Sequence, residues 1–228
     1  MNSLADPTVS ELLERLHAEA DAQMPELRST IRATRQAEDG NDQTPEAWYD
    51  KLQDFYLPVN REQGRFLYQT VRAVRPERIV EFGSSFGVSA IYLAAGLRDN
   101  GAGTLVGSEL IEKKAATARK NLAAAGLDDL TDIRTGDARQ TLKDPSGLID
   151  IVLLDGGPAL YTEILQMLVP NLRPGALVIA DNVDDEDHPY PTWVRNLAHG
   201  FVSSSITLKG GTEYSIWTGT PTQQVSTP

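Results

Sequence analysis

Short apolar runs alternate with segments of helical periodicity between residues 78 and 180. The apolar runs, each with the length and composition of a buried strand, are Arg78 to Phe82, Thr104 to Ser108, Thr131 to Thr135, Asp150 to Leu154 and Ala176 to Ala180. The helical segments between them are Val88 to Leu97, Glu112 to Ala125, Ala138 to Leu142 and Leu160 to Leu172. Nearly continuous apolar strands separated by helices predict an α/β fold, a Rossmann-like doubly wound sheet covered on both faces.

The end of the chain departs from this alternation. Two strand-like runs, Phe201 to Leu208 and Thr212 to Thr218, are joined by a short connection containing two glycines. Such a connection is typical of an antiparallel hairpin. The complete sheet is therefore predicted to have seven strands, mostly parallel, with one antiparallel strand near the C-terminus.

Residues 1–58 predict an N-terminal helical extension that serves as a lid or as a dimer element. A helix is expected from Thr8, with a capping box, to about Arg35, split at Pro25, and a second helix is expected to open at Thr44. Residues 59–220 are expected to form the main domain, in which a helix capped by Asn60 precedes the first strand. Residues 221–228 have little to bury and are expected to be a disordered tail.

Composition narrows the classes of partner. The 228 residues include 21 Lys and Arg against 32 Asp and Glu, and the net charge of -11 would repel a nucleic acid. The absence of Cys excludes disulfides and thiolate chemistry. No apolar run is long enough to span a membrane and the start of the chain does not resemble a signal peptide, so no membrane partner and a cytoplasmic location are expected.

The stretch Glu81-Phe82-Gly83-Ser84-Ser85-Phe86-Gly87 predicts a strand, a glycine turn and the start of a helix. Gly lacks a Cβ and the first amides of a helix lack partners, so a ligand can approach the backbone here. The GxxxG spacing differs from the GxGxxG of a dinucleotide site, and the Glu81 carboxylate would attract a cation rather than a phosphate. Taken alone, the turn is equally compatible with a ligand loop and with a simple bend.

Acidic residues stand at the ends of all five parallel strands. In order they are Glu81, Glu109, Asp137, Asp155 and Asp181. Ligands of open α/β sheets bind at the carboxyl ends of the strands, and Glu109 lies where a carboxylate can accept ribose hydroxyls. Glu109 could also be a solvated strand end, and Asp137 could face an amine or only cap a helix.

Asp155, Asp181 and Asn182 supply three hard oxygen ligands from strands that we expect to be neighbours. This set suits Mg²⁺ or Ca²⁺. The alternative is that Asp155 and the pair Asp181-Asn182 each begin a turn.

At these residues the chain resembles the class I S-adenosylmethionine methyltransferases, and within them the cation-dependent, catechol O-methyltransferase-like family. The resemblance runs from about Leu57 to Gly219. Its most specific segments are Glu81-Phe82-Gly83 with Gly87 and Ser89, Ser108-Glu109-Leu110, Gly136-Asp137-Ala138, and Asp155 with Asp181-Asn182. It implies methyl transfer to a hydroxyl of a small molecule, and we also expect a homodimer.

The resemblance also implies roles for individual residues. Those expected to bind S-adenosylmethionine are Val59, Glu81, Gly83, Ser84, Ser89, Glu109, Asp137, Ala138 and Asp155. Within this set Glu109 would hold the ribose, Asp137 and Ala138 would border the adenine, and Val59, Glu81, Gly83 and Ser89 would contact the methionine part. Asp155, Asp181 and Asn182 would hold one divalent cation, most simply Mg²⁺, which makes Asp155 catalytic as well.

One departure from the family affects the general base. The family commonly has a Lys about one turn after the first metal-binding Asp, whereas this chain has Pro158. His188 is the replacement candidate and Tyr161 the second, although the segment Asp184 to Pro191 also fits a solvated acidic loop. Three other functions stay open: a metal-independent methyltransferase of sugar hydroxyls or amines, a nicotinamide-dependent oxidoreductase, and a non-catalytic cofactor-binding module.

Overall fold

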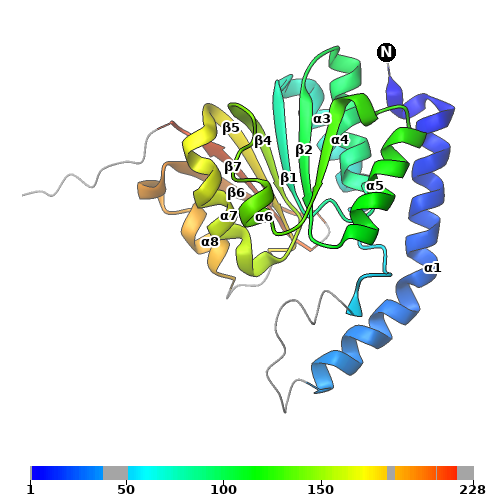
Figure 1. The fold of residues 1–228 in the computed structure, drawn as a ribbon. Helices are drawn as coiled ribbons and strands as arrows, with labels where there is room; N and C mark the ends of the chain where they lie inside the picture. The colour runs from blue at the N-terminus through cyan, green and yellow to red at the C-terminus, as the bar shows by residue number, and fades with distance from the viewer. Residues whose placement is uncertain (1, 38–50, 184–187, 209, 220–228) are drawn as a thin grey trace, which may run out of the picture.

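The computed structural model describes residues 2–37, 51–183, 188–208 and 210–219. Its strands are β1 (Arg78–Phe82), β2 (Thr104–Glu109), β3 (Thr131–Thr135), β4 (Ile149–Leu154), β5 (Leu172–Asp181), β6 (Phe201–Ile206) and β7 (Thr212–Trp217). They form one seven-stranded sheet in the order β3-β2-β1-β4-β5-β7-β6 (Figure 1). Strands β1 to β5 pair in parallel, and β7 is antiparallel to both β5 and β6. The predicted sheet is confirmed.

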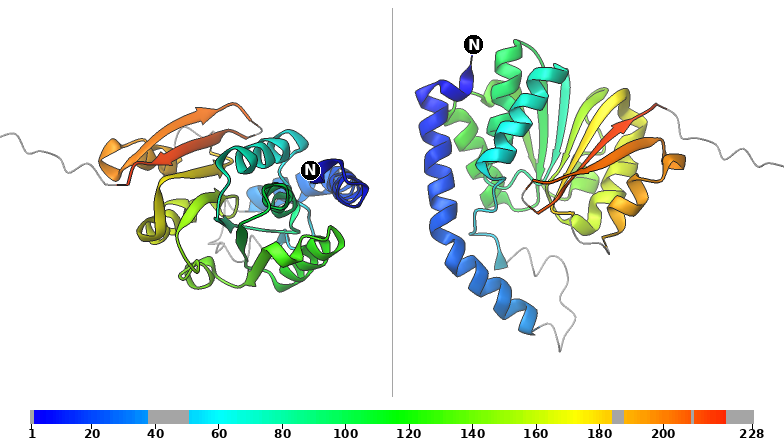
Figure 2. Two further views of the ribbon diagram at one scale, coloured as in Figure 1. Left: turned by 90° about the horizontal axis from the view of Figure 1, so that it is seen from above. Right: turned by 180° about the vertical axis from the view of Figure 1, so that it is seen from behind.

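Helices cover both faces of this sheet (Figure 2). One layer contains α1 (Pro7–Ala37), α3 (Arg61–Val74), α4 (Val88–Asn100) and α5 (Glu112–Ala124), and the other contains α6 (Ala138–Thr141), α7 (Tyr161–Leu168) and α8 (Pro189–Val194). Because side chains alternate along a strand, Ile79 joins the core under the first layer and Val80 the core under the second. None of the helices in the described ranges is long and apolar enough to cross a membrane.

Helix α1 continues through Pro25, so the predicted split there is wrong. The ribbon bends part-way along α1 (Figures 1 and 2), as expected of a helix that contains a proline, which lacks the backbone N–H. The helix is held on both sides of the proline: Leu16 lies in the main core, and Leu27 packs in a small cluster with Phe55. Its start is capped by the Asp6 carboxylate, which accepts the N–H of Thr8, rather than by Thr8 itself.

Other differences from the predicted elements are local. The helix expected to end at Leu172 stops at Leu168, and Leu172 already belongs to β5. The second half of the expected acidic loop is the short helix α8, which starts with Pro189 and buries Tyr190. The expectation of a solvated loop is therefore wrong for α8, because its apolar face packs on the sheet. The predicted start at Thr44, residues 184–187 and the tail 221–228 lie outside the described residues.

The order of the strands in the sheet determines where a ligand site is expected. The connections run outward in one direction from β1 to β3 and in the other direction from β4 to β5. The carboxyl ends of β1 and β4 therefore flank a crevice, the usual ligand position in an open α/β sheet.

Candidate active site

An open cleft lies at the carboxyl ends of β1 to β4. Its empty volume, including the part open to solvent, is about 940 Å³. Its lining includes Gly83, Glu109, Asp137, Ala138 and Asp155. Each of the four strand ends therefore contributes at least one of the residues that the sequence predicted to bind the cofactor.

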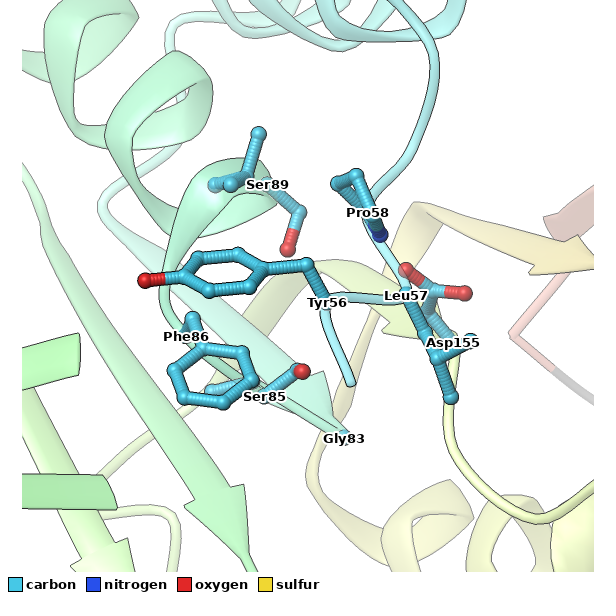
Figure 3. A pocket seen from close by; sticks show the side chains of 10 residues that line it. Tyr56, Leu57, Pro58, Gly83, Ser85, Phe86, Ser89 and Asp155 are labelled. Carbon is cyan, nitrogen blue, oxygen red and sulfur yellow. The ribbon is translucent and has the colours of Figure 1, made fainter. Parts of the chain in front are cut away.

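A smaller pocket of about 240 Å³ adjoins the cleft and contains Ser84 and Ser89 (Figure 3). The two pockets share Leu57, Gly83, Ser85 and Asp155. The stacked rings of Tyr56 and Phe86, with centroids 4.0 Å apart, lie on the other side of this pocket from Asp155. A ligand could therefore extend from the cleft into the pocket past Gly83 and Asp155.

The glycine turn forms the boundary between these two spaces. Gly83 has φ +95°, and the N–H groups of Gly83 and Ser84 both donate to the carbonyl oxygen of Ser108. A Cβ on Gly83 would lie 2.5 Å from Cα of Gly156, which follows β4. Gly83 is thus required by both its backbone conformation and the contact between the two strand ends.

Ser85 gives this turn an unusual feature. It has φ +45°, a left-handed conformation that is uncommon for a residue other than Gly. Its hydroxyl is buried and has no hydrogen-bond partner among the described residues, although Ser85 lines both pockets. Because buried polar groups are normally paired, a ligand with a polar group fits this position.

Glu81 lies beneath the turn. It is fully buried, does not line any of the three described pockets, and accepts hydrogen bonds from Ser84 Oγ at 2.5 Å and Ser89 Oγ at 2.6 Å. Burial raises the pKa of Glu81 to about 7, the two serines oppose the rise, and the charge of Glu109 adds to it. In this structure Glu81 holds the serines of the turn, and its contact with a cofactor stays a prediction.

We expect the Glu81→Gln substitution to change how stability depends on pH. Unfolded Glu81 releases its proton near the ordinary pKa of 4.5 and native Glu81 near 7, so the native state binds more protons between these values. This residue therefore lowers the free energy of unfolding as pH rises from 4.5 to 7, by as much as about 3 kcal/mol. Urea unfolding of both proteins should show the variant gaining stability relative to the original chain across this window; a constant difference would contradict the assignment.

The carboxylate of Glu109 is held in place by the backbone. Oε2 accepts the N–H of Ser85 at 2.8 Å and Oε1 accepts the N–H of Ile111 at 2.9 Å. Each carboxylate oxygen can accept more than one hydrogen bond, so both can still bind a hydroxyl in the cleft. The geometry is therefore suited to two neighbouring hydroxyl groups.

Asp137 combines the two roles considered from the sequence. It caps α6 by accepting the N–H of Arg139 at 2.9 Å, which confirms the capping role, and it also lines the cleft. The Arg139 side chain donates to both carboxylate oxygens, and this interaction lowers the pKa of Asp137. Sequence reasoning missed Arg139, although its position two residues after an acidic helix cap was a usable signal.

The proposed metal ligands come from neighbouring strand ends. Leu154 on β4 pairs with Ala180 on β5, so Asp155 and Asp181 follow at adjacent positions. Asp181 is buried; its Oδ1 accepts from Gln63 Nε2, and its Oδ2 accepts from Asn182 Nδ2 at 2.9 Å. Among the described residues, no group of three or more His, Cys, Asp or Glu is placed so that it could hold a metal.

The donor chemistry of Asp155, Asp181 and Asn182 nevertheless suits a hard cation, since all three can offer oxygen. To act as a ligand, Asn182 must present its amide oxygen instead of the NH₂ that it donates to Asp181. Asp181 and Val59 line a third pocket, of about 230 Å³, and are not among the residues lining the two pockets next to the glycine turn.

The two candidates for a general base occupy structural positions. His188 caps α8, with its Nδ1 accepting the N–H of Tyr190 at 3.2 Å, and it does not line any of the three described pockets. Tyr161 is fully buried, and its hydroxyl donates to the carbonyl oxygen of Asp181 at 3.1 Å. Their part in proton transfer stays a prediction.

Sequence reasoning missed part of the wall of the site. Leu57 lines both pockets next to the glycine turn and Lys114 lines the cleft, although neither stands directly at a strand end. The exposure of Leu57, 41%, is high for an apolar residue. Only the fold brings the segment before α3 over the glycine turn.

Comparison with known proteins identifies the family. The profile of a methyltransferase domain matches residues 80–183. A catechol O-methyltransferase of Niastella koreensis is 36% identical over 131 residues, and one of Mycobacterium tuberculosis is 33% identical over 128 residues. Each match covers 56% of this chain, but only 58% and 57% of the respective relatives.

A solved structure extends the match to most of a relative. The O-methyltransferase TomG of Streptomyces achromogenes, involved in tomaymycin synthesis and solved in complex with S-adenosylmethionine, is 30% identical with a TM-score of 0.63. The similarity covers 72% of this chain and 82% of that chain. Together with the seven-stranded fold and the cleft at its switch point, this match shows that the chain belongs to the O-methyltransferases that use S-adenosylmethionine.

Proposed function

We propose that the protein binds S-adenosylmethionine and transfers its methyl group to a hydroxyl of a small molecule. The observation that carries this proposal is the Glu109 carboxylate, held by two backbone N–H groups on the wall of the cleft beside the glycine turn. It offers two acceptors at the switch point of the sheet, where a ribose diol would bind.

The remaining features fit the rest of this cofactor. The adenosine occupies the cleft, with its adenine beside Asp137 and Ala138, and the methionine part extends into the smaller pocket with Ser89. The unpaired hydroxyl of Ser85 lies where the two spaces meet and gains a polar partner. The carboxylates that line the cleft favour a ligand with a positively charged sulfonium.

Methyl transfer is proposed to occur next to Asp155. It lines both pockets, so the sulfonium centre lies near this residue when the cofactor spans them. Methyl transfer requires the acceptor oxygen, the methyl carbon and the sulfur to be aligned, and holding them so is a large part of catalysis. The protein therefore acts by positioning the acceptor next to Asp155.

We include one divalent cation, Mg²⁺ by preference, held by Asp155, Asp181 and Asn182. When bound, it would lower the pKa of an acceptor hydroxyl and so reduce the need for a strong base. A bound cation would therefore support activity although Pro158 stands where the family commonly has a basic Lys. His188 is the side chain proposed to accept a proton near neutral pH.

A metal-independent methyltransferase is the second candidate. The hydrogen bond from Asn182 to Asp181 favours it, because it satisfies an oxygen that a cation would need. Under this alternative Asp155 alone would orient the acceptor.

The acceptor is proposed to be an uncharged or cationic hydroxylated small molecule, since the net charge of -11 disfavours anions. We retain a homodimer and a cytoplasmic location as parts of this proposal. The lack of Cys is compatible with a reducing compartment.

A transfer assay tests the function. Phenols, catechols, sugars and amines are incubated with S-adenosylmethionine carrying an isotopically labelled methyl group, and the products are analysed by mass spectrometry. We expect the label on a hydroxyl oxygen; transfer only to amines, or no transfer at all, would contradict the proposal.

Metal removal separates the two candidates in the same assay. A chelator should slow transfer and added Mg²⁺ should restore it, because the acceptor hydroxyl becomes less acidic without the cation. Binding of S-adenosylhomocysteine, measured by calorimetry, is the control and should be retained. Full activity in the chelator would reject the cation and favour the metal-independent reaction.

A further inference from the structure

Lys114 on α5 is an unusual residue in the wall of the cleft. It is only 5% exposed, whereas Lys side chains are seldom fully buried without a partner. It lines the cleft together with Glu109, Leu110 and Ile111. Burial lowers the pKa of Lys114, and the charges of Glu109 and Asp54 oppose this effect.

The ammonium group of Lys114 lacks a hydrogen-bond acceptor within the described part of the chain. Its contact there is with the ring of Phe86, whose centroid lies 5.4 Å from Nζ. Asp54, the second acid that influences Lys114, forms its ion pair with the neighbouring Lys113. A largely buried lysine side chain on the wall of the cleft, with hydrogen-bond donors still available, is a position that a ligand can complete.

We propose that Lys114 is a cofactor-binding residue that donates a hydrogen bond to a ribose hydroxyl of the nucleoside bound at Glu109. This inference rests on the proposed function, because it takes the adenosine of S-adenosylmethionine as the occupant of the cleft. It adds a donor to the acceptor that Glu109 supplies.

The chemistry of a ribose diol matches this pair. A carboxylate only accepts hydrogen bonds and an ammonium only donates them, whereas each hydroxyl does both. A ribose hydroxyl can therefore donate to Glu109 and accept from Lys114 at the same oxygen. The Phe86 ring holds the ammonium beside the glycine turn without using its hydrogen-bond donors.

Calorimetric titration with S-adenosylhomocysteine and its 2′-deoxy and 3′-deoxy analogues tests this role. The Lys114→Met substitution should weaken binding of S-adenosylhomocysteine about tenfold, the loss expected for one charged hydrogen bond. The same substitution should change the affinity for at least one deoxy analogue by less than about twofold, because that analogue lacks the hydroxyl in question. Lys120→Met removes an exposed lysine of the same helix and should leave all three affinities unchanged.

Equal losses for all three ligands would assign Lys114 a structural role and overturn the inference, as would an unchanged affinity for S-adenosylhomocysteine. If Lys114→Met fails to fold, Lys114→Leu, which likewise lacks a donor, is tested with the same ligands and the same expected pattern. The unmodified chain provides an independent check, since equal binding of both deoxy analogues and of the parent compound would also overturn the inference. Failure of that chain to bind S-adenosylhomocysteine would instead reject the proposed function, and this inference with it.

Discussion

Replacing Glu109 with Gln should weaken the binding of S-adenosylhomocysteine by about 100-fold. Both carboxylate oxygens of Glu109 accept a backbone N–H, from Ser85 and Ile111. An amide has only one oxygen, so the substituted side chain would turn its NH₂ group toward one of these donors and would also lose the charge that strengthens bonds to ribose hydroxyls. Two charged hydrogen bonds of about 1.5 kcal/mol each give the expected loss.

Calorimetry measures this change, with Glu112→Gln as the matched control. Glu112 is exposed at the start of α5 and pairs with Arg119, so its substitution should leave the affinity unchanged. Equal affinities of the Glu109 variant and the original chain would show that the cofactor does not use this carboxylate.

The Gly83→Ala substitution should lower the free energy of unfolding by about 4 kcal/mol. One part of the cost is the backbone, because Ala must adopt φ +95°. The other part is steric, since the new Cβ would lie 2.5 Å from Cα of Gly156 and 2.6 Å from the carbonyl oxygen of Asp155. Backbone atoms cannot move aside as a flexible side chain can, so the ends of β1 and β4 must separate.

Gly101→Ala separates these two costs. Gly101 also has a positive φ, +76°, but its Cβ would meet no atom within 4 Å. We expect it to lose only about 1 kcal/mol, the backbone part. Urea unfolding measures both variants, and equal losses would show that the contact between the two strand ends does not constrain Gly83.

The ends of the parallel strands were predictable for a physical reason. Buried strands have a strong apolar signal, and the residue that follows each one must lie at the same edge of a parallel sheet. Glu109, Asp137 and Asp155 therefore meet in one cleft as expected. The handedness and the order of the connections between strands then determine which of these strand ends are neighbours.

Features that depend on contacts between distant segments were not predictable. Leu57 reaches the glycine turn only through the packing of the segment before α3, and Lys114 is buried because α5 lies against the ring of Phe86. The continuity of α1 through Pro25 likewise depends on packing along the helix, which local propensity does not describe. The exact position of Glu81 beneath the turn requires the hydroxyls of Ser84 and Ser89.

A crystal structure of the protein with S-adenosylhomocysteine tests the central claim most directly. We predict that the ribose hydroxyls lie within hydrogen-bonding distance of the Glu109 carboxylate and that the homocysteine end occupies the smaller pocket beside Ser89, with the sulfur near Asp155. A ligand bound with its ribose away from Glu109, or outside the cleft between β1 and β4, would contradict the account.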